Sequence, residues 1–150
     1  MDPIQRLLSR LRQRDCEELA EYGLTIAQAE QSMRSPHVDF CMWSTPAGPA
    51  AAMWFDALTP RALCVSLLAT DEWDQVALSV IKYGVRVVRP KLLRLGYTRA
   101  ECRTMAHHED ALRLLSRMGF VCEVKLRGYG AKGADFYQYA WNIMDHQNAA

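Results

Sequence analysis

The sequence has no long apolar run that is free of charged side chains. Its most apolar segments carry charges within any window of about 18 residues, whereas a membrane-spanning helix needs about 20 consecutive apolar residues. Four arginines between Arg6 and Arg14 interrupt the N-terminal segment, which excludes a secretory signal there. We therefore expect a soluble protein that stays in the cytoplasm and has no membrane segment.

The cysteines have no pattern that is typical of a bridge or a metal site. Their number, five, is odd, and they form no C-x-x-C motif, which argues against a disulfide framework and a cysteine zinc site. Each lies in or next to an apolar run. We expect small core side chains in a reducing compartment at all five positions: Cys16, Cys41, Cys64, Cys102 and Cys122.

Other metal-binding patterns are absent too. His107, His108 and Glu109 are consecutive, so on a helix their side chains point apart, and no further ligand has a suitable spacing. The sequence therefore predicts no metal site. We interpret His108 as the residue that caps the helix following it.

The net charge of +1 implies no particular partner, but the basic residues are unevenly distributed. Nine basic residues and three acidic ones lie between Lys82 and Arg117, and a second basic group lies between Arg6 and Arg14. Solvated helix faces are the first interpretation, and an anionic ligand is the second. Nucleic acid ranks last, because no aromatic side chains are interleaved with the basic ones and no reader motif is present.

Hydrophobic periodicity predicts helices and strands in a mixed order. Helices are expected over 4–22 (as one or two), 25–33, 75–95 and 107–118, with a kink or break near Arg86 to Arg89 because Pro90 cannot continue a regular helix. Strands are expected over 38–44, 51–58, 61–69, 97–105, 121–127 and 136–142. Pro46, Gly48 and Pro49 are assigned to the first turn, 128–133 to a flexible hairpin loop, and 145–150 to a frayed tail.

This order predicts one α/β domain over residues 1–150. Its sheet should be mixed and mostly antiparallel, with about six strands and helices on both faces, because the middle strand-helix-strand unit needs a crossover between parallel neighbours. The expected parts are N-terminal helices (1–36), a three-stranded meander (37–70), a helix-strand-helix-hairpin unit (71–142) and a tail (143–150).

Two segments resemble the GNAT acetyltransferase family. HHEDALRLLSRMGF is similar to the family's fourth helix, N-x-x-A-x-x-L-Y-x-x-x-G-F, with matches at Ala111, Leu114, Gly119 and Phe120. GPAAAMWFDALTPRALCVSLLATDEW resembles the family's hairpin and the cofactor-binding strand that follows it. The resemblance covers about 15–142 and implies a GNAT fold.

A narrower resemblance is to GNAT-like proteins of short-tailed bacteriophages, which are associated with assembly of the virion and its internal proteins. It implies a phage origin, a role as a virion component or assembly factor in the host cytoplasm or the virion, and other virion proteins or further copies of the chain as partners. The residues that carry it are Thr70, Asp74, Gln75, Val76, Arg113, Leu115 and Gly119.

The residues that usually make this fold a catalyst are missing. The family holds the pyrophosphate of acetyl-CoA with Q/R-x-x-G-x-G/A at the start of its third helix, where glycines let backbone N–H groups approach. Here no glycine lies between Thr70 and Gly84, and Asp71, Glu72 and Asp74 would repel the phosphates while favouring the helix N-terminus. The tyrosine that often serves as the general acid in this family aligns with Leu115, whose side chain cannot donate a proton. We therefore predict a degenerate acetyl-CoA site and assign no catalytic residue.

An active acetyl-CoA-dependent N-acetyltransferase, acting on an unidentified amine, stays open as the alternative. Arg86 or Arg89 would then reach the phosphates. If no cofactor binds, Trp73 is the candidate exposed anchor for a protein partner. If acetyl-CoA binds, the resemblance implies contacts with Leu68, Ala69, Thr70, Gln75, Val76 and His108.

Overall fold

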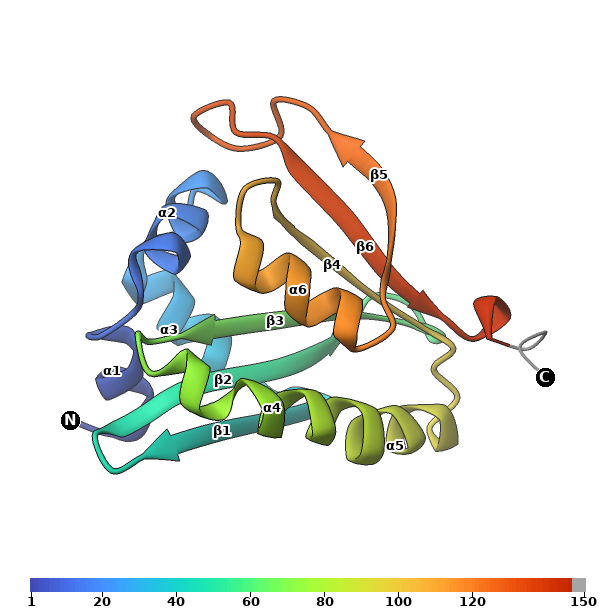
Figure 1. Ribbon diagram of the computed structural model, residues 1–150, viewed down its shortest axis with the longest axis horizontal. Helices are drawn as coiled ribbons and strands as arrows, with labels where there is room; N and C mark the ends of the chain where they lie inside the picture. The colour runs from blue at the N-terminus through green and yellow to red at the C-terminus, as the bar shows by residue number, and fades with distance from the viewer. Residues whose placement is uncertain (147–150) are drawn as a thin grey trace.

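The computed structural model describes residues 1–146 and contains one six-stranded sheet, with strand order β1-β2-β3-β4-β6-β5 (Figure 1). Only the β3–β4 pair is parallel, and the other four pairs are antiparallel. The predicted α/β class and mixed, mostly antiparallel sheet are confirmed. The strands are β1 (Asp39–Thr45), β2 (Gly48–Ala57), β3 (Ala62–Ala69), β4 (Arg99–Met105), β5 (Val121–Leu126) and β6 (Phe136–Asn142).

Three short helices precede the sheet, namely α1 (Pro3–Leu8), α2 (Gln13–Glu21) and α3 (Ile26–Arg34). Asp2 and Thr25 cap α1 and α3, each in a reciprocal capping box with a glutamine three residues later. The expected helices over 4–22 and 25–33 are thus confirmed, the first as two helices. Apolar side chains of all three pack with Ala52, Trp54 and Leu68 on one face of the sheet.

The opposite face is covered by α4 (Trp73–Tyr83), α5 (Arg89–Arg94) and α6 (Glu109–Arg117). A π-helical segment, Gly84–Val88, joins α4 to α5, so the break predicted near Pro90 takes the form of a widened turn. This form relieves the strain that a proline, lacking an N–H group, imposes on a regular helix. The main core, which includes Met53, Val80 and Leu115, lies between these helices and the sheet.

The strand boundaries differ from the prediction at two turns. The turn between β1 and β2 is tighter than expected, because Gly48 pairs with Thr45 and Pro49 already belongs to β2. Pro49 is tolerated there because the register shifts beside it, between Trp43 and Ser44. Strand β4 begins at Arg99, two residues later than predicted.

The chain ends differ in part from the prediction as well. Ile143–Asp145 forms a 3-10 turn, so the expected tail begins with a turn, and its last four residues, 147–150, lie outside the described residues.

Cys16 and Cys122 are exposed, so the expectation of core cysteines was wrong for these two. Within 1–146, no helix is long and apolar enough to cross a bilayer.

Strands β3 and β4 separate soon after they meet. Their pairing consists of Ala62 with Arg99, Leu63 with Ala100, and Cys64 with Glu101. Beyond these pairs β4 continues alongside β6, whereas β3 stays with β2, and the strand ends diverge (Figure 1). The backbone of the second half of β3 therefore faces a cleft instead of a neighbouring strand.

Candidate functional site

A cavity of about 310 Å³ lies where β3 and β4 diverge. Its lining comes from both faces of the sheet: Leu114 and Leu115 of α6 on one side, and Leu19 of α2 and Trp54 of β2 on the other. A cavity that passes between two strands is accessible only because the strands do not pair there. We therefore take this cleft as the candidate site.

The end of β3 is bonded to the N-terminal segment of the chain. The Ala69 N–H donates to Oδ2 of Asp15 over 2.6 Å, and the Ala69 carbonyl accepts from the Arg12 N–H over 3.0 Å. Asp15 is 1% exposed, and its carboxylate also pairs with Nε of Arg12 at 3.1 Å. Both backbone polar groups of Ala69 are thus occupied by residues at the start of α2.

His108 completes this buried cluster. Its Nε2 lies 2.7 Å from Oδ1 of Asp15, and its Nδ1 accepts the backbone N–H of Ala111 over 3.3 Å. Since Nδ1 is an acceptor, Nε2 carries the hydrogen and donates it to Asp15. The expected capping role of His108 is confirmed, and both ring nitrogens are engaged within the chain. Leu115, which stands at the family's tyrosine position, is buried in the main core.

A second carboxylate of α2 bonds to β4. Oε1 of Glu18 accepts the hydroxyl of Thr104 and the backbone N–H of Met105, both over 2.6 Å. Burial raises the pKa of Glu18 above the ordinary glutamate value, and the two hydrogen bonds oppose that shift. The contact therefore places a carboxylate in an environment that disfavours its charge.

A third carboxylate of α2 reaches the loop between β5 and β6. The backbone N–H groups of Lys132 and Ala134 donate to Oε2 of Glu21 over 3.0 and 3.4 Å, and the Ala131 N–H donates to the Glu21 carbonyl over 2.7 Å. The predicted hairpin loop is present, and these hydrogen bonds attach it to α2; its flexibility stays a prediction. Backbone amides of the loop converge on one anion, as in the turns that bind phosphates or carboxylates.

The start of α4 is also occupied by groups of the chain. The N–H groups of Glu72 and Trp73 donate to the hydroxyl and the carbonyl of Thr70, and the Glu72 carboxylate accepts from the Thr70 hydroxyl and pairs with Arg10. The acidic residues at this helix start make no side-chain capping hydrogen bond, contrary to a simple capping role. Two N-terminal amides are used internally, and a carboxylate lies where a pyrophosphate would need positive potential.

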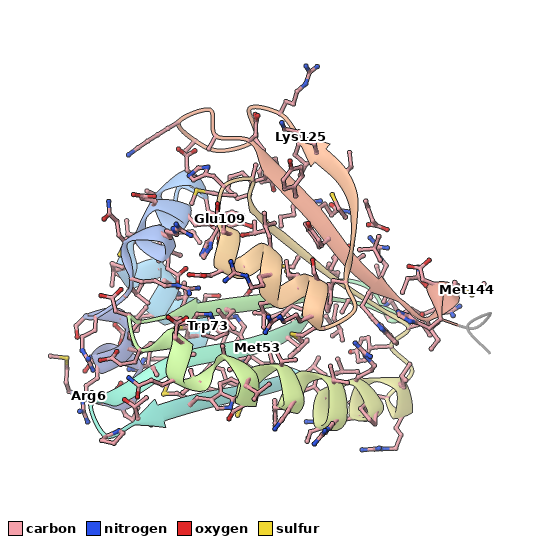
Figure 2. All side chains as sticks on the ribbon, viewed as in Figure 1. Arg6, Met53, Trp73, Glu109, Lys125 and Met144 are labelled. Atoms are coloured by element: carbon pink, nitrogen blue, oxygen red, sulfur yellow. The ribbon has the colours of Figure 1, made fainter. Side chains whose placement is uncertain are left out.

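The proposed protein anchor, Trp73, is not exposed. It is 6% exposed and belongs to the same main core as Met53 of β2 (both are labelled in Figure 2). The guanidinium group of Arg12 lies 5.3 Å from the centre of its ring. The expectation for Trp73 was wrong because Trp73 lies in the first turn of α4, and this helix packs on the sheet.

The sequence-based cofactor contacts are only partly brought together. Ala69, Thr70 and His108 lie around the end of β3, the first and last linked through Asp15. Leu68, which packs against the N-terminal helices, lines the cleft cavity together with His108, whereas Val76 lies in the main core and Gln75 is exposed to solvent. Both backbone polar groups of Ala69 are paired within the chain, its N–H group with Asp15 and its carbonyl with Arg12.

Sequence analysis missed the carboxylates of α2. Asp15, Glu18 and Glu21 recur every three residues and so share one helix face, which is a readable signal. Each of them accepts a backbone N–H group, which leaves no trace in the sequence, and their side-chain partners His108 and Thr104 are distant in the chain. Their role could therefore be found only from the structure.

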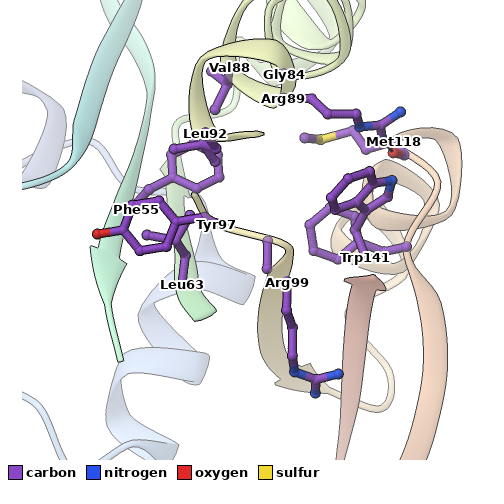
Figure 3. A pocket seen from close by; sticks show the side chains of 12 residues that line it. Phe55, Leu63, Gly84, Val88, Arg89, Leu92, Tyr97, Arg99, Met118 and Trp141 are labelled. Atoms are coloured by element: carbon purple, nitrogen blue, oxygen red, sulfur yellow. Dashed lines mark hydrogen bonds between the residues drawn. The ribbon is translucent and has the colours of Figure 1, made fainter. Parts of the chain in front are cut away.

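Arg89 is directed into the protein, not toward a phosphate site. It lines a small cavity of about 30 Å³ together with Leu92 and Trp141 (Figure 3). Its guanidinium group donates to the Met118 carbonyl and lies 4.8 Å from the Trp141 ring centre. Burial lowers the pKa of Arg89 below the ordinary arginine value. Arg89 is thus committed to the core, whereas Arg86 is exposed.

Comparison with known proteins gives structural matches only. No family model and no curated protein sequence match the chain. The solved structure of Ard1 from Thermoplasma volcanium is similar over 95% of this chain and 94% of that one, with TM-score 0.72 and 15% identity.

Two further structures are similar. The ribosomal-protein-S18-alanine N-acetyltransferase of Escherichia coli covers 79% of this chain, over 77% of its own, with TM-score 0.61 and 14% identity. A Bacillus subtilis acetyltransferase in complex with CoA covers 69% of this chain, over 75% of its own, with TM-score 0.54 and 14% identity. At these identities the matches establish the architecture alone. The chain therefore has the GNAT acetyltransferase fold.

Proposed function

We propose that this chain is a non-catalytic GNAT-fold protein with a degenerate acetyl-CoA site that acts by binding other proteins. One observation carries the proposal: the N–H and carbonyl groups of Ala69, at the open end of β3, are both bonded to the start of α2. An incoming cofactor would have to break these buried hydrogen bonds. Each buried polar group left without a partner costs about 1–3 kcal/mol.

The charges at the start of α4 support the same proposal. The pyrophosphate of acetyl-CoA needs free backbone N–H groups and positive potential. Here Glu72 provides a carboxylate, and its partner Arg10 is already paired with it. Near the cleft, Leu115 has no proton to donate, and both nitrogens of His108 are engaged.

The class of partner rests on the sequence resemblance to phage GNAT-like proteins. We propose virion proteins as partners and virion assembly as the process. Co-purification from infected cells tests this: a tagged chain should retain other virion proteins under conditions in which a tagged GNAT enzyme of the host retains none. Recovery of the chain alone, together with its absence from purified particles, would contradict this part of the proposal.

Calorimetric titration with acetyl-CoA and with CoA tests the degenerate site. We expect no heat of binding and no thermal stabilisation at millimolar cofactor. If the Kd were about 10 μM, a ligand concentration of about 1 mM would be a hundredfold excess. The free energy of unfolding of the protein would then rise by about 2.7 kcal/mol. That outcome would contradict the proposal.

An N-acetyltransferase is the second candidate, because a cavity of about 310 Å³ is present at the β3–β4 cleft and two matched structures are acetyltransferases by name. Incubation with acetyl-CoA and a panel of primary amines, followed by mass spectrometry, tests it. An acetylated product that requires the protein would establish this candidate. No product, with no cofactor binding, would leave the first proposal standing.

A further inference from the structure

One face of α2 carries three carboxylates, and each accepts backbone N–H groups from a different part of the sheet. Asp15 accepts from β3, Glu18 from β4 and Glu21 from the β5–β6 loop. These donors lie on both sides of the β3–β4 cleft and at its open end. The helix therefore takes the place that a further strand would occupy between the separated strands.

The apolar contribution of α2 is small. Leu19 is its only buried apolar side chain, whereas α1 buries Leu7 and Leu8, and α3 buries Ala29 and Met33. The helix is thus held mainly by polar contacts. Such contacts can be exchanged for equivalent ones with a ligand, whereas a large apolar contact must be broken without replacement.

The end of α2 is attached at the protein surface. Glu21 bonds to the loop amides, and the hydroxyl of Tyr22 donates to the Arg103 carbonyl, while Gly23 follows in the left-handed conformation at φ 73°. Tyr22 is 38% exposed. Detaching this end of the helix would uncover one side of Phe136, whose ring centre lies 5.1 Å from that of Tyr22, but would leave the apolar contacts of α1 and α3 in place.

We infer that α2 is a displaceable plug, an autoinhibitory contact that covers the N–H groups of Ala69 and Met105 at the β3–β4 cleft with the chain's own carboxylates and leaves a cavity of about 310 Å³ beside it. The inference rests on the proposed function, because it explains why the cleft does not accept acetyl-CoA. A ligand that replaces α2 must offer hydrogen-bond acceptors, such as amide carbonyls or carboxylates, to the N–H groups of Ala69 and Met105. The amide-containing arm of acetyl-CoA is a probe of that chemistry.

Two variants release the outer end of α2. Glu21→Lys removes the acceptor of the loop amides and places a positive charge beside them. Gly130→Ala leaves α2 unchanged, but its added Cβ overlaps the Glu21 carboxylate, with Cδ of Glu21 at 2.9 Å. Glu17→Lys is the matched control, since it makes the same charge change on the exposed side of α2, where Glu17 accepts only from the Gln13 side chain among the hydrogen bonds of the described residues.

The first measurement is amide hydrogen exchange in wild type and the three variants. We expect the Met105 amide to exchange at least about tenfold faster in Glu21→Lys and Gly130→Ala, and the Ala69 amide to follow by a smaller factor. The amides of α4 should exchange at wild-type rates in all three variants. In Glu17→Lys, the Met105 and Ala69 amides should also exchange at wild-type rates. Unchanged exchange at Met105 and Ala69 in both releasing variants would overturn the plug while leaving the proposed function intact.

The second measurement is calorimetric titration of the same proteins with acetyl-CoA. We expect measurable binding in the releasing variants and none in wild type or Glu17→Lys. Faster exchange without any binding at millimolar acetyl-CoA would overturn the plug, because the cleft would then be closed to this chemistry by other groups. Equal binding by wild type and the variants would overturn both the plug and the proposed function.

Discussion

Removal of the Asp15 carboxylate should be among the most damaging single changes in this chain. The side chain is 1% exposed and accepts from the Ala69 N–H and from Nε2 of His108, while it pairs with Nε of Arg12. In Asp15→Ala the Ala69 N–H and His108 Nε2 lose their acceptor in a buried environment, and Arg12 loses the carboxylate beside its Nε. The Arg12 side chain, at 7% exposure, cannot recover full hydration without local unfolding.

The expected loss follows from the buried ion pair. Breaking such a pair by removing one partner costs about 3–5 kcal/mol when the charge that stays behind has no other partner, whereas Nη1 of Arg12 keeps a second carboxylate, that of Asp110, at 3.4 Å. We therefore expect the free energy of unfolding to fall by about 3 kcal/mol in Asp15→Ala, the lower end of that range. For a domain of this size, this corresponds to a fall in Tm of about 6–12 °C. Asp15→Asn retains one acceptor oxygen and should lose less.

Urea denaturation followed by circular dichroism measures the effect, with Glu17→Ala as the control on the exposed side of the same helix. The control should stay within about 0.5 kcal/mol of wild type. The denaturant dependence should be unchanged in all proteins, so that the midpoint reports stability. A loss below about 1 kcal/mol in Asp15→Ala would refute the reasoning, since water or a rearranged side chain would then replace the carboxylate.

Three further predictions concern other contacts. Glu18→Gln keeps both hydrogen bonds without the buried charge and should stay within about 1 kcal/mol of wild type by urea denaturation, whereas Glu18→Ala should lose about 1–3 kcal/mol; equal losses would contradict this. Arg99 lowers the pKa of Glu123 to about 2, so the pair stabilises the fold above the ordinary value of 4.5 and ceases to do so as the pH falls toward 2. The stability difference between wild type and Glu123→Gln, about 0.2–1 kcal/mol at pH 6 for this half-exposed pair, should vanish near pH 2 in acid titrations, and a constant difference would argue against it. Arg89→Ala, which removes a partly buried hydrogen bond and a cation–π contact, should lower the unfolding free energy by about 1–3 kcal/mol, while Arg86→Ala should have little effect.

Local sequence signals account for most of the fold. Thr25 and the spacing of apolar residues define α3, alternation defines β6, and Pro90 marks the point where the helix changes its pitch. These features depend on residues close in the chain. The crossover between β3 and β4 also follows from element order alone.

The candidate site was less predictable, because its contacts join distant residues to backbone groups. Asp15 lies 54 positions from Ala69, and Glu18 lies 87 positions from Met105. Trp73 was misjudged for a related reason, since a tryptophan in a polar segment can be buried by the helix it begins. The loop amides around Glu21 carry no side-chain signal at all.

The short β3–β4 seam has a mechanical consequence. The sheet consists of two plates, β1–β2–β3 and β4–β6–β5, joined by a ladder that ends at Cys64 and Glu101. Rotation of one plate against the other about this ladder disturbs few backbone hydrogen bonds. Of the five strand pairs, β3–β4 has the fewest paired residues, so we expect the sheet to bend most easily there. The spacing of the plates beyond the seam then depends on what lies between them, namely α6 together with the side chains of Asp15, Glu18 and Glu21.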